Sequence, residues 1–259
     1  KQSRPCVEKY DHIAAPWDRI LVEQRFYERV SSIHAVAIRM PNVIASDPES
    51  RVLVLEDLGD AADFTYLYRG QLIHEDRLRS LATYLRRLHD VTQRDEPEPL
   101  LLNRDMRALN HLHIFEVPLQ VNNGVELDRY ELWLADQAAA LRNDGQFRAA
   151  VSELGDRYLQ DGPCLLHGDY FPGSWLDVDD DVRVIDPEFG FYGDREFDLG
   201  VAMAHLRLAA QNFDYGKLFL AAYTGRDMEP GFDMELVARY AAIEVVRRIL
   251  GVAQLPIPP

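Results

Sequence analysis

The 259-residue sequence contains only two cysteines, Cys6 and Cys164, and they form no CxxC pattern. So few thiols exclude a disulfide framework and favour a reducing compartment, in which both are expected to be buried. No apolar run approaches the roughly 18 residues that a membrane-spanning helix needs. No signal-peptide pattern leads the sequence either. Together these absences predict a cytoplasmic protein with no membrane partner.

Positive charge is also scarce. The sequence has 28 Lys and Arg residues against 43 Asp and Glu residues, which gives a formal net charge of −15 at pH 7. A surface of that sign repels the phosphates of nucleic acid and of anionic lipid, so neither is predicted as a partner. Apolar residues make up 47% of the chain, enough for a real core in one large domain or two modest lobes.

Periodic apolar residues predict that the second part of the chain is mostly helical. Helices are expected over five segments: Trp17 to Ser32, Gln71 to Val91, Asp128 to Arg142, Leu199 to Tyr223 and Met234 to Val252. Short apolar runs predict strands over four others: Ile33 to Arg39, Val52 to Leu55, Cys164 to Leu166 and Val182 to Ile185.

A lobe boundary is predicted near residue 58. The run VLVLEDLGD ends an apolar strand in acidic and glycine residues, which is typical of a connection rather than of a strand that continues. Residues 1–58 are therefore expected to form a partial N-terminal lobe with a hinge. Residues 59–259 are expected to form a helical C-terminal lobe that carries the catalytic loop.

The polar residues with the most specific pattern lie between His167 and Asp198, in the string HGDYFPGSWLDVDDDVRVIDPEF. Asp169 follows one predicted strand, and Asp186 and Glu188 follow another, so the two groups face one another if those strands pair as a hairpin. Phosphoryl transfer needs a carboxylate that orients the attacking hydroxyl and hard oxygen ligands that hold magnesium. Any one of these acids alone would by default be a solvated loop residue. Their joint pattern favours phosphotransfer.

Two adjacent arginines, Arg247 and Arg248, interrupt the apolar helix EVVRRILGVA. Neighbouring helical positions point about 100° apart, so at least one of the pair must lie near the apolar face. A charge placed there needs a partner. That partner is either a substrate at an acidic site or an acidic residue in a buried salt bridge.

The sequence resembles a known superfamily at these motifs. His167, Gly168 and Asp169, followed five residues later by Ser174, resemble the catalytic loop of the aminoglycoside phosphotransferase and choline kinase superfamily. The strings HGDYFPGSW and IDPEFGFYGDREFDLG are most similar to its methylthioribose kinase subgroup, which has Ser where most members have Asn. The resemblance implies an α+β, protein-kinase-like two-lobed fold, with ATP and Mg²⁺ as cofactors and a small-molecule hydroxyl as substrate.

The resemblance also implies where the nucleotide binds. Lys1 is expected to contact the α- and β-phosphates, and Glu23, on the first predicted helix, is expected to pair with it. Backbone groups of a hinge made by Glu56, Asp57 and Leu58 are expected to meet the adenine. No glycine-rich phosphate loop precedes Lys1 in this sequence, so the N-terminal lobe is only partly present and the natural protein is expected to extend further.

The matching positions assign the remaining roles. Asp169 is the implied catalytic carboxylate and contacts the substrate hydroxyl. Asp186 and Glu188 are the implied magnesium ligands. Ser174 is a weaker ligand than Asn and is expected to act through a water. The implied mechanism is in-line transfer from magnesium ATP.

Three further contributions follow from the same resemblance. His167 is expected to fix the catalytic loop by packing and hydrogen bonding rather than by accepting a proton. Asp198 is expected to anchor that loop by accepting hydrogen bonds from its backbone amides. Arg247 and Arg248 match the arginine pair that holds the sugar in methylthioribose kinases, so they are implied to bind the substrate.

Several alternatives remain open at the level of sequence. The substrate could be a methylthioribose-like sugar, an aminoglycoside or choline, or another small alcohol, because specificity depends on a few contacts. The chain could also be a pseudokinase that binds a nucleotide without turnover. A homodimer is possible, and ATP is not distinguished from GTP.

A calcium-binding EF-hand is a remote alternative. Asp177, Asp179, Asp181 and Glu188 match positions 1, 3, 5 and 12 of its loop. The match is poor because Val182 stands where the loop needs glycine for its sharp turn. The DVDDD run is better explained as the turn of a hairpin.

Overall fold

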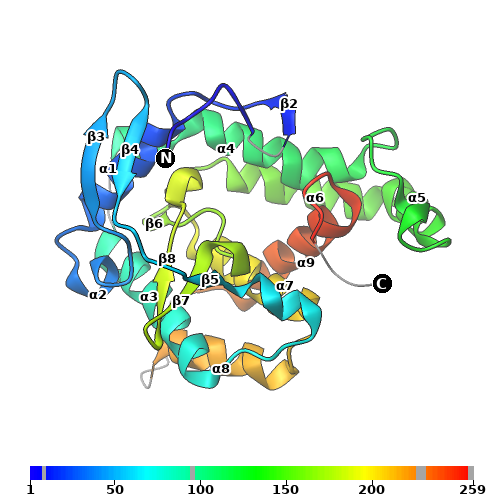
Figure 1. Ribbon diagram of the computed structural model, residues 1–259. Coiled ribbons are helices and arrows are strands. Elements are labelled where there is room, and N and C mark those ends of the chain that lie inside the picture. The colour runs from blue at the N-terminus through cyan, green and yellow to red at the C-terminus, as the bar shows by residue number, and fades with distance from the viewer. Residues whose placement is uncertain (8–9, 94–96, 226–231, 256–259) are drawn as a thin grey trace.

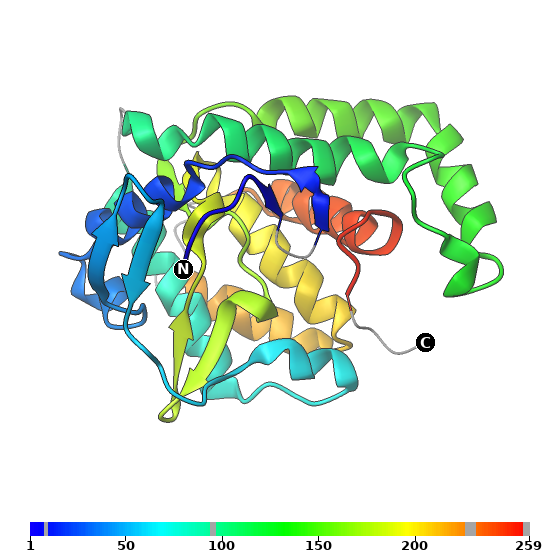
Figure 2. The same ribbon diagram turned by 45° about the horizontal axis from the view of Figure 1, so that its top comes forward.

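The computed structural model describes residues 1–7, 10–93, 97–225 and 232–255 of the chain, and every predicted site residue lies in these ranges. The first part of the chain contains an antiparallel hairpin of β3 (Val43–Asp47) and β4 (Val52–Leu55), with helices α1 (Arg19–Val30) and α2 (His34–Ala37) beside it. Figures 1 and 2 show this hairpin and α1 at one end of the molecule, with the larger helical part next to them.

Helix α1 forms where the apolar spacing predicted it. Ile20, Phe26, Tyr27 and Val30 are buried on one face, which packs against the β3–β4 hairpin. Glu23 lies on the same buried face and is fully excluded from solvent. The helix therefore delivers a carboxylate to the interior beneath the strands.

The first residues of the chain add an edge to this hairpin. The amino group of Lys1 donates to the carbonyl oxygen of Leu53 at 2.8 Å, and the amide of Leu53 donates back to the carbonyl of Lys1 at 2.9 Å. Gln2 continues the pairing with an antiparallel bridge to Val52. Because Leu53 is fully buried, Lys1 starts next to the core rather than in solvent.

The predicted strand over 33–39 is wrong, because these residues form α2 and a following turn. The segment HAVAIR carries two alanines, which favour a helix. Val36 is the buried residue of α2, and a helical turn buries this single side chain as well as a strand would. The partner of β4 is instead Val43–Asp47, whose five residues are all exposed and so gave no apolar signal. The strand predicted over 52–55 is confirmed as β4.

Two small sheets lie in the larger part. Strand β7 (Trp175–Val178) pairs with both β5 (Ala62–Asp63) and β8 (Asp181–Val184), and β6 (Cys164–Leu166) pairs with β9 (Phe191–Gly193). The predicted pairing of the strand before Asp169 with the strand before Asp186 is therefore wrong.

The partner of β8 is set by the turn that precedes it. Asp179 and Asp180 have φ of 50° and 64°, which is the left-handed conformation that a tight two-residue hairpin requires. This turn joins β7 directly to β8, so the prediction of a hairpin turn at DVDDD is confirmed. The same hairpin overturns the EF-hand alternative, because strands and not helices flank these acids.

The remaining elements are mostly helical. The helices are α3 (Glu75–Thr92), α4 (Arg104–His111), α5 (Leu134–Asn143), α6 (Gly145–Tyr158), α7 (Arg195–Leu208), α8 (Phe213–Thr224) and α9 (Met234–Leu250). Shorter turns are η1 (Phe64–Arg69), η2 (Pro99–Leu102), the π-helical η3 (Leu112–Glu116), η4 (Val117–Leu119), η5 (Leu127–Arg129), η6 (Pro172–Ser174) and η7 (Pro187–Phe189). Strands β1 (Cys6–Val7) and β2 (Tyr10–Ala14) form a separate pair.

Several helix boundaries differ from the prediction for local reasons. Helix α3 starts at Glu75 rather than at residue 71, because the His74 ring accepts a hydrogen bond from the amide of Asp76 and caps it. The single helix predicted over 199–223 is two helices, since Ala210 has a φ of 50° and Asn212 caps α8. Helix α9 lies almost where it was predicted.

One hydrophobic core joins both parts of the molecule. Phe26 and Leu53 from the first part belong to the same buried cluster as Leu85 of α3 and Trp175 of β7. Around this cluster α3 packs on α8, and α7 packs on α9. None of the helices in the described residues is long and apolar enough to cross a membrane.

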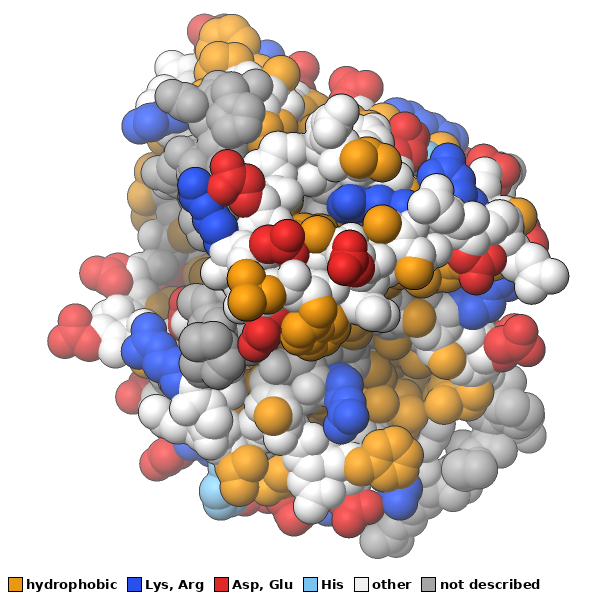
Figure 3. All heavy atoms as spheres, turned by 90° about the vertical axis from the view of Figure 1, so that its right-hand side faces the viewer, with side chains coloured by type: hydrophobic (Ala, Val, Ile, Leu, Met, Phe, Trp, Pro, Cys, Tyr) orange, Lys and Arg blue, Asp and Glu red, His pale blue; other side chains and the backbone are white. Residues whose placement is uncertain are grey.

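The surface on one side of the molecule carries intermixed charge. In Figure 3 acidic and basic side chains alternate with hydrophobic ones, and no large area of a single sign covers this face. On this face the acidic side chains are therefore dispersed among basic and hydrophobic ones and form no continuous acidic patch.

Candidate active site

The loop that follows β6 is anchored from below by Asp198 of α7. Its two carboxylate oxygens accept hydrogen bonds from the backbone amides of His167 at 2.7 Å and Gly168 at 3.0 Å. Asp198 is fully buried, and Nε2 of His89 lies 3.2 Å from its Oδ2. Gly168 has a φ of 84°, and a Cβ there would lie 2.1 Å from the carbonyl oxygen of Phe189. This position therefore requires glycine.

His167 connects the same loop to the end of β8. Its ring is fully buried, and Nε2 lies 2.9 Å from the carbonyl oxygen of Ile185. Burial lowers the pKa of this imidazole, so it is neutral near pH 7 and Nε2 carries the proton that it donates to the carbonyl. The contact places the loop of Asp169 beside the residue that precedes Asp186. The hydrogen bond of His167 thus brings the loop of Asp169 close to Asp186, which a pairing of the two preceding strands was expected to do.

Asparagine at position 198 is expected to destabilise the protein. The amide nitrogen of Asp198→Asn would face a backbone N–H donor in a buried site, which leaves at least one donor unpaired. We expect the free energy of unfolding, measured by denaturant titration, to fall by about 2–4 kcal/mol. The exposed variant Asp214→Asn is the control and should change it by less than about 0.5 kcal/mol. Equal stability of the two variants would contradict the anchoring role.

Asp169 lies at the surface of the loop, with 18% of its side chain exposed. Its Oδ1 is 3.3 Å from Nη2 of Arg248 and 3.7 Å from Nη1 of Arg247. Its backbone carbonyl accepts a hydrogen bond from the hydroxyl of Ser174 at 3.0 Å. Ser174 is itself only 3% exposed, so its hydroxyl shapes the loop, and its role as a metal ligand stays a prediction.

Lys1 lies at the centre of an acidic cluster. Its Nζ is 2.7 Å from Glu23, 2.9 Å from Asp186 and 3.0 Å from Glu188. Burial opposes the charge of the ammonium, but the three carboxylates together raise its pKa above the ordinary value. Burial also raises the pKa of Glu23, to about 7, against the lowering effect of Lys1. Lys1 therefore stays charged and is held in one place.

Asp186 and Glu188 are arranged to face a cation. Asp186 has φ 59° and ψ 51°, a left-handed conformation that aspartate tolerates better than most residues, and about half of its side chain is exposed. Glu188 lies between two cations, since Nε of Arg19 is 3.5 Å from the same Oε2 that contacts Lys1. The carboxylate oxygens of both residues thus already contact a positively charged side chain.

These two acids fit a magnesium ion bound together with a nucleotide. Within the described residues, no group of three or more His, Cys, Asp or Glu side chains is arranged to hold a metal ion by itself. Magnesium does not require such a cage, because it commonly binds one or two carboxylates, several waters and the substrate phosphates. The Lys1 ammonium occupies the space between Asp186 and Glu188, so a cation is accommodated there.

A cavity of about 480 Å³ opens beside this cluster. Lys1, Asp186 and Glu188 line it, with Arg4 and Arg19 nearby. Three basic and two acidic side chains at one cavity are suited to a polyphosphate with its counterion. Asp169 is not among the described residues that line this cavity. The loop of Asp169 is instead connected to the strand end that carries Asp186 by the hydrogen bond from His167 to the carbonyl oxygen of Ile185.

The arginine pair is buried and shares an acidic partner in its own helix. Arg247 and Arg248 are 6% and 7% exposed. Glu244, one turn earlier in α9, accepts from Nη1 of Arg247 at 3.2 Å and from Nε of Arg248 at 2.6 Å. The buried acid that the sequence offered as one partner is thus present, and both arginines also lie within ion-pair distance of Asp169. Their contact with a substrate stays a prediction.

Comparison with known proteins shows the family of the chain. A family model described as the phosphotransferase enzyme family matches residues 12–236, most of the chain. The chain belongs to this family. The chain is 33% identical over 175 residues to a methylthioribose kinase of Enterobacter sp. (strain 638), over 62% of this chain and 42% of that kinase. It spans less than two thirds of the length of the curated relatives it matches.

Solved structures confirm the predicted kinase-like fold of the chain. It resembles the choline kinase LicA from Streptococcus pneumoniae with a TM-score of 0.56 and 16% identity, over 88% of this chain and 69% of that one. It resembles an aminoglycoside-3'-phosphotransferase of type VIII with a TM-score of 0.52 and 20% identity, over 87% and 80% of the two chains. At such low identity these likenesses show the fold alone.

The predicted hinge follows β4 directly. The amide of Glu56 donates to the carbonyl of Asn42 at 2.8 Å, and its carboxylate accepts from the side-chain amide of Asn42 at 2.7 Å. Oδ1 of Asp57 accepts from the amide of Gly59 at 2.9 Å. These carboxylates shape the connection. Contact of its backbone, including Leu58, with adenine stays a prediction, as does the boundary near residue 58.

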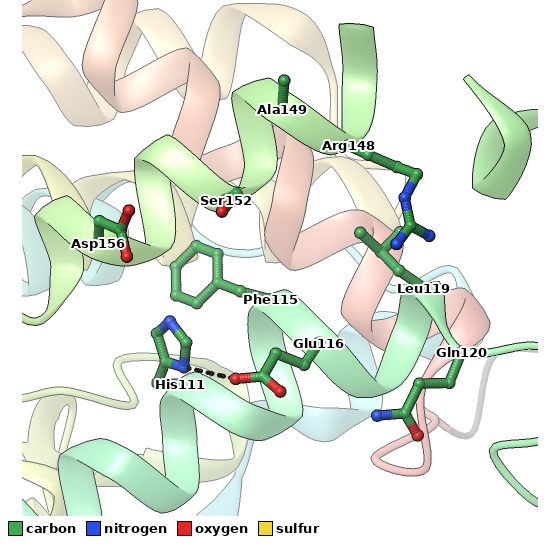
Figure 4. Close-up of a pocket in the computed structure, with 9 residues that line it drawn as sticks. All are labelled: His111, Phe115, Glu116, Leu119, Gln120, Arg148, Ala149, Ser152 and Asp156. Carbon is green, nitrogen blue, oxygen red and sulfur yellow. Dashed lines mark ion pairs between the residues drawn. The ribbon is translucent and has the colours of Figure 1, made fainter. Parts of the chain in front are cut away.

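Two larger cavities lie away from the loop of Asp169. One, of about 540 Å³, lies between α6 and the α4–η3 segment, with Asp156 on the side of His111 and Arg148 pointing toward Leu119 (Figure 4). The other, of similar volume, is an apolar groove between α7, α8 and α9. The described lining of neither includes a catalytic-loop residue, so cavity size does not identify the active site here.

The sequence did not predict four side chains that lie around the arginine pair. They are Tyr68, Phe171, His205 and Glu244. Glu244 could have been found, because it precedes the two arginines by three and four positions, the helical spacing for ion pairs. Tyr68 and His205 are 137 positions apart and carry no such signal.

Proposed function

We propose that this phosphotransferase transfers the γ-phosphoryl group of ATP to a hydroxyl of a small, neutral, sugar-like molecule, with methylthioribose as the leading candidate. The observation that carries the proposal is the contact of Arg247 and Arg248 with Asp169, at 3.7 and 3.3 Å. The similarity to methylthioribose kinases supports the choice of substrate.

In this proposal the residues of the chain divide into two groups. Lys1, oriented by Glu23, contacts the nucleotide phosphates, and Asp186 and Glu188 hold magnesium beside them. Bound magnesium supplies neutralisation of the charge that develops during transfer. Asp169 accepts a hydrogen bond from the acceptor hydroxyl, orients it for in-line attack and takes its proton.

The charge around Asp169 favours a neutral acceptor. Two guanidinium groups and two carboxylates, those of Asp169 and Glu244, meet here and leave no net formal charge. A cationic acceptor such as choline or an aminoglycoside would approach two arginines, and an anionic one would approach Asp169. Sugar hydroxyls both donate and accept hydrogen bonds, so they can satisfy arginine and carboxylate together. This argument places a sugar above the cationic alternatives.

A matched screen tests the substrate class. With magnesium ATP, we expect methylthioribose or another neutral pentose to be phosphorylated with a kcat/KM at least about 100-fold above that of choline or kanamycin. Nucleotide consumption gives the rate, and mass spectrometry of the acceptor identifies the product.

Two variants of helix α9 serve as a pair in this screen. Arg247→Gln is expected to reduce the preference for the neutral sugar, whereas Arg239→Gln, on the same helix but away from Asp169, should leave it unchanged. Faster turnover of choline or kanamycin by the unaltered protein would contradict the proposal. Nucleotide-dependent thermal stabilisation without turnover of any acceptor would favour the pseudokinase instead.

A further inference from the structure

A buried chain of hydrogen bonds supports the arginine pair from the side opposite Asp169. The hydroxyl of Tyr68 lies 2.5 Å from Nδ1 of His205, and Nε2 of His205 lies 3.1 Å from Oε1 of Glu244. The same Oε1 accepts from Nε of Arg248 at 2.6 Å, and Oε2 accepts from Arg247 at 3.2 Å. Tyr68, His205 and Glu244 are each 2% exposed or less. We call these three residues the arginine support.

The direction of each hydrogen bond in the arginine support is fixed by its members. Burial lowers the pKa of His205 to about 4, so its imidazole is neutral near pH 7 and carries one proton. The carboxylate of Glu244 only accepts, so that proton is assigned to Nε2. Nδ1 must then accept from the Tyr68 hydroxyl. The chain therefore runs from Tyr68 through His205 to Glu244 without an unpaired group between them.

Glu244 is charged despite complete burial. Burial alone would raise its pKa, but Arg247, Arg248 and the hydrogen bond from His205 hold it well below the ordinary value. Its charge is shared by two guanidinium groups that would otherwise repel each other. Without it, Asp169 would be the remaining carboxylate within ion-pair distance of both arginines among the described residues.

The catalytic loop holds Arg248 from a second direction. Its guanidinium carbon lies 4.8 Å from the centre of the Phe171 ring, and that ring lies 5.2 Å from the ring of His205. Arg248 is thus held by the arginine support, whose members lie on η1, α7 and α9, and also by Phe171 of the loop. A guanidinium held by a carboxylate and an aromatic face has little freedom to change direction.

We propose that Glu244, backed by His205 and Tyr68, is a positioning residue of the acceptor site. It directs Arg247 and Arg248 toward the acceptor and balances their charge, so that Asp169 remains able to accept a hydrogen bond from the acceptor hydroxyl. This inference rests on the proposed function, because it assigns Glu244 to the site at which the sugar binds.

The test is the neutral, nearly isosteric variant Glu244→Gln, assayed with methylthioribose and magnesium ATP. We expect the KM for the acceptor to rise about 10- to 100-fold and the KM for ATP to change less than about twofold. Glu196→Gln is the matched control, because this buried acid of α7 contacts the backbone of Asp233 and no residue of the acceptor site. It should change neither constant.

A milder variant keeps the test decisive if Glu244→Gln does not fold. Tyr68→Phe removes one hydroxyl from the far end of the support, and we expect it to raise the acceptor KM about 3- to 10-fold with the KM for ATP unchanged. A parallel rise of both constants, or an equal effect of Glu196→Gln, would reduce Glu244 to a purely structural residue and overturn the inference.

A crystal structure separates this inference from the proposed function. If the unaltered protein phosphorylates no neutral sugar, the proposed function fails, and the ligand-free structure of Glu244→Gln, or of Tyr68→Phe, decides the inference alone. We expect both guanidinium groups in Glu244→Gln to move closer to Asp169, so that their distances of 3.7 and 3.3 Å to its Oδ1 shorten, and Arg248 in Tyr68→Phe to leave its present direction. Arginines that keep their distances of 3.3 and 3.7 Å to Asp169 would overturn it.

Discussion

Replacing Asp169 by asparagine is expected to lower kcat by about 10²- to 10⁴-fold, the range for loss of a general base. The asparagine side chain has nearly the same shape, and its oxygen can still accept from Arg248, so the loop should keep its structure. It cannot take the proton of the acceptor hydroxyl. Because Lys1, Asp186 and Glu188 lie in a separate cluster, the affinity for magnesium nucleotide should be unchanged. Steady-state kinetics and calorimetric nucleotide titration measure the two quantities.

The exposed residue Asp136 of α5 provides the control for this change. Asp136→Asn alters the net charge by the same amount but is expected to leave kcat within about twofold, as substitutions away from functional features generally do. Normal turnover by Asp169→Asn would remove it as the catalytic carboxylate. An equal loss of nucleotide affinity would instead show that the variant disturbs the whole site.

The sequence predicted the local features of the site well. The short strand before His167 and the hairpin turn at DVDDD are determined by neighbouring residues, and the structure has both. The strongly periodic helices were also found, because an apolar stripe at helical spacing must face the core. Family resemblance supplied the candidate partners of Lys1, which no local pattern could identify.

The errors have a common physical origin in contacts between distant residues. The segment over 33–39 was predicted as a strand because its short apolar run fits either period, and only packing of Val36 decides between them. The expected pairing of the strands before Asp169 and Asp186 failed because a tight turn gives β8 a nearer partner. Local geometry is readable from sequence, whereas the choice of strand partner depends on the whole fold.

The surroundings of the arginine pair illustrate the same limit. The sequence showed that a buried arginine needs a partner, and it left open whether that partner is a substrate or an acid. The structure places Arg247 and Arg248 between Glu244 and Asp169. The sequence thus predicts that a buried arginine has a partner but does not identify it. The hydrogen bonds of His205 with Tyr68 and Glu244 form only when α7, α9 and η1 pack together.

Removing the charge of Asp186 is expected to weaken magnesium-dependent nucleotide binding about 10- to 100-fold, the effect of losing one charge-assisted contact. Two variants separate charge from backbone strain. Asp186 has a φ of 59°, a conformation that asparagine tolerates and alanine does not. Asp186→Asn therefore tests the carboxylate alone, while Asp186→Ala adds a strain of about 1 kcal/mol to it. Nucleotide titration at several magnesium concentrations measures the loss.

The dependence on magnesium is the decisive quantity in this comparison. If Asp186 holds the ion, the affinity of Asp186→Asn for nucleotide without magnesium should match or exceed that of the unaltered protein, since one negative charge near the phosphates is gone. Only the gain on adding magnesium should fall. If Asp186 instead serves only to orient Lys1, the variant should bind nucleotide more weakly with and without magnesium, because Lys1 would lose one of its three carboxylate contacts. That second result would leave Glu188 as the one remaining carboxylate of the predicted magnesium site and would contradict the assignment of Asp186.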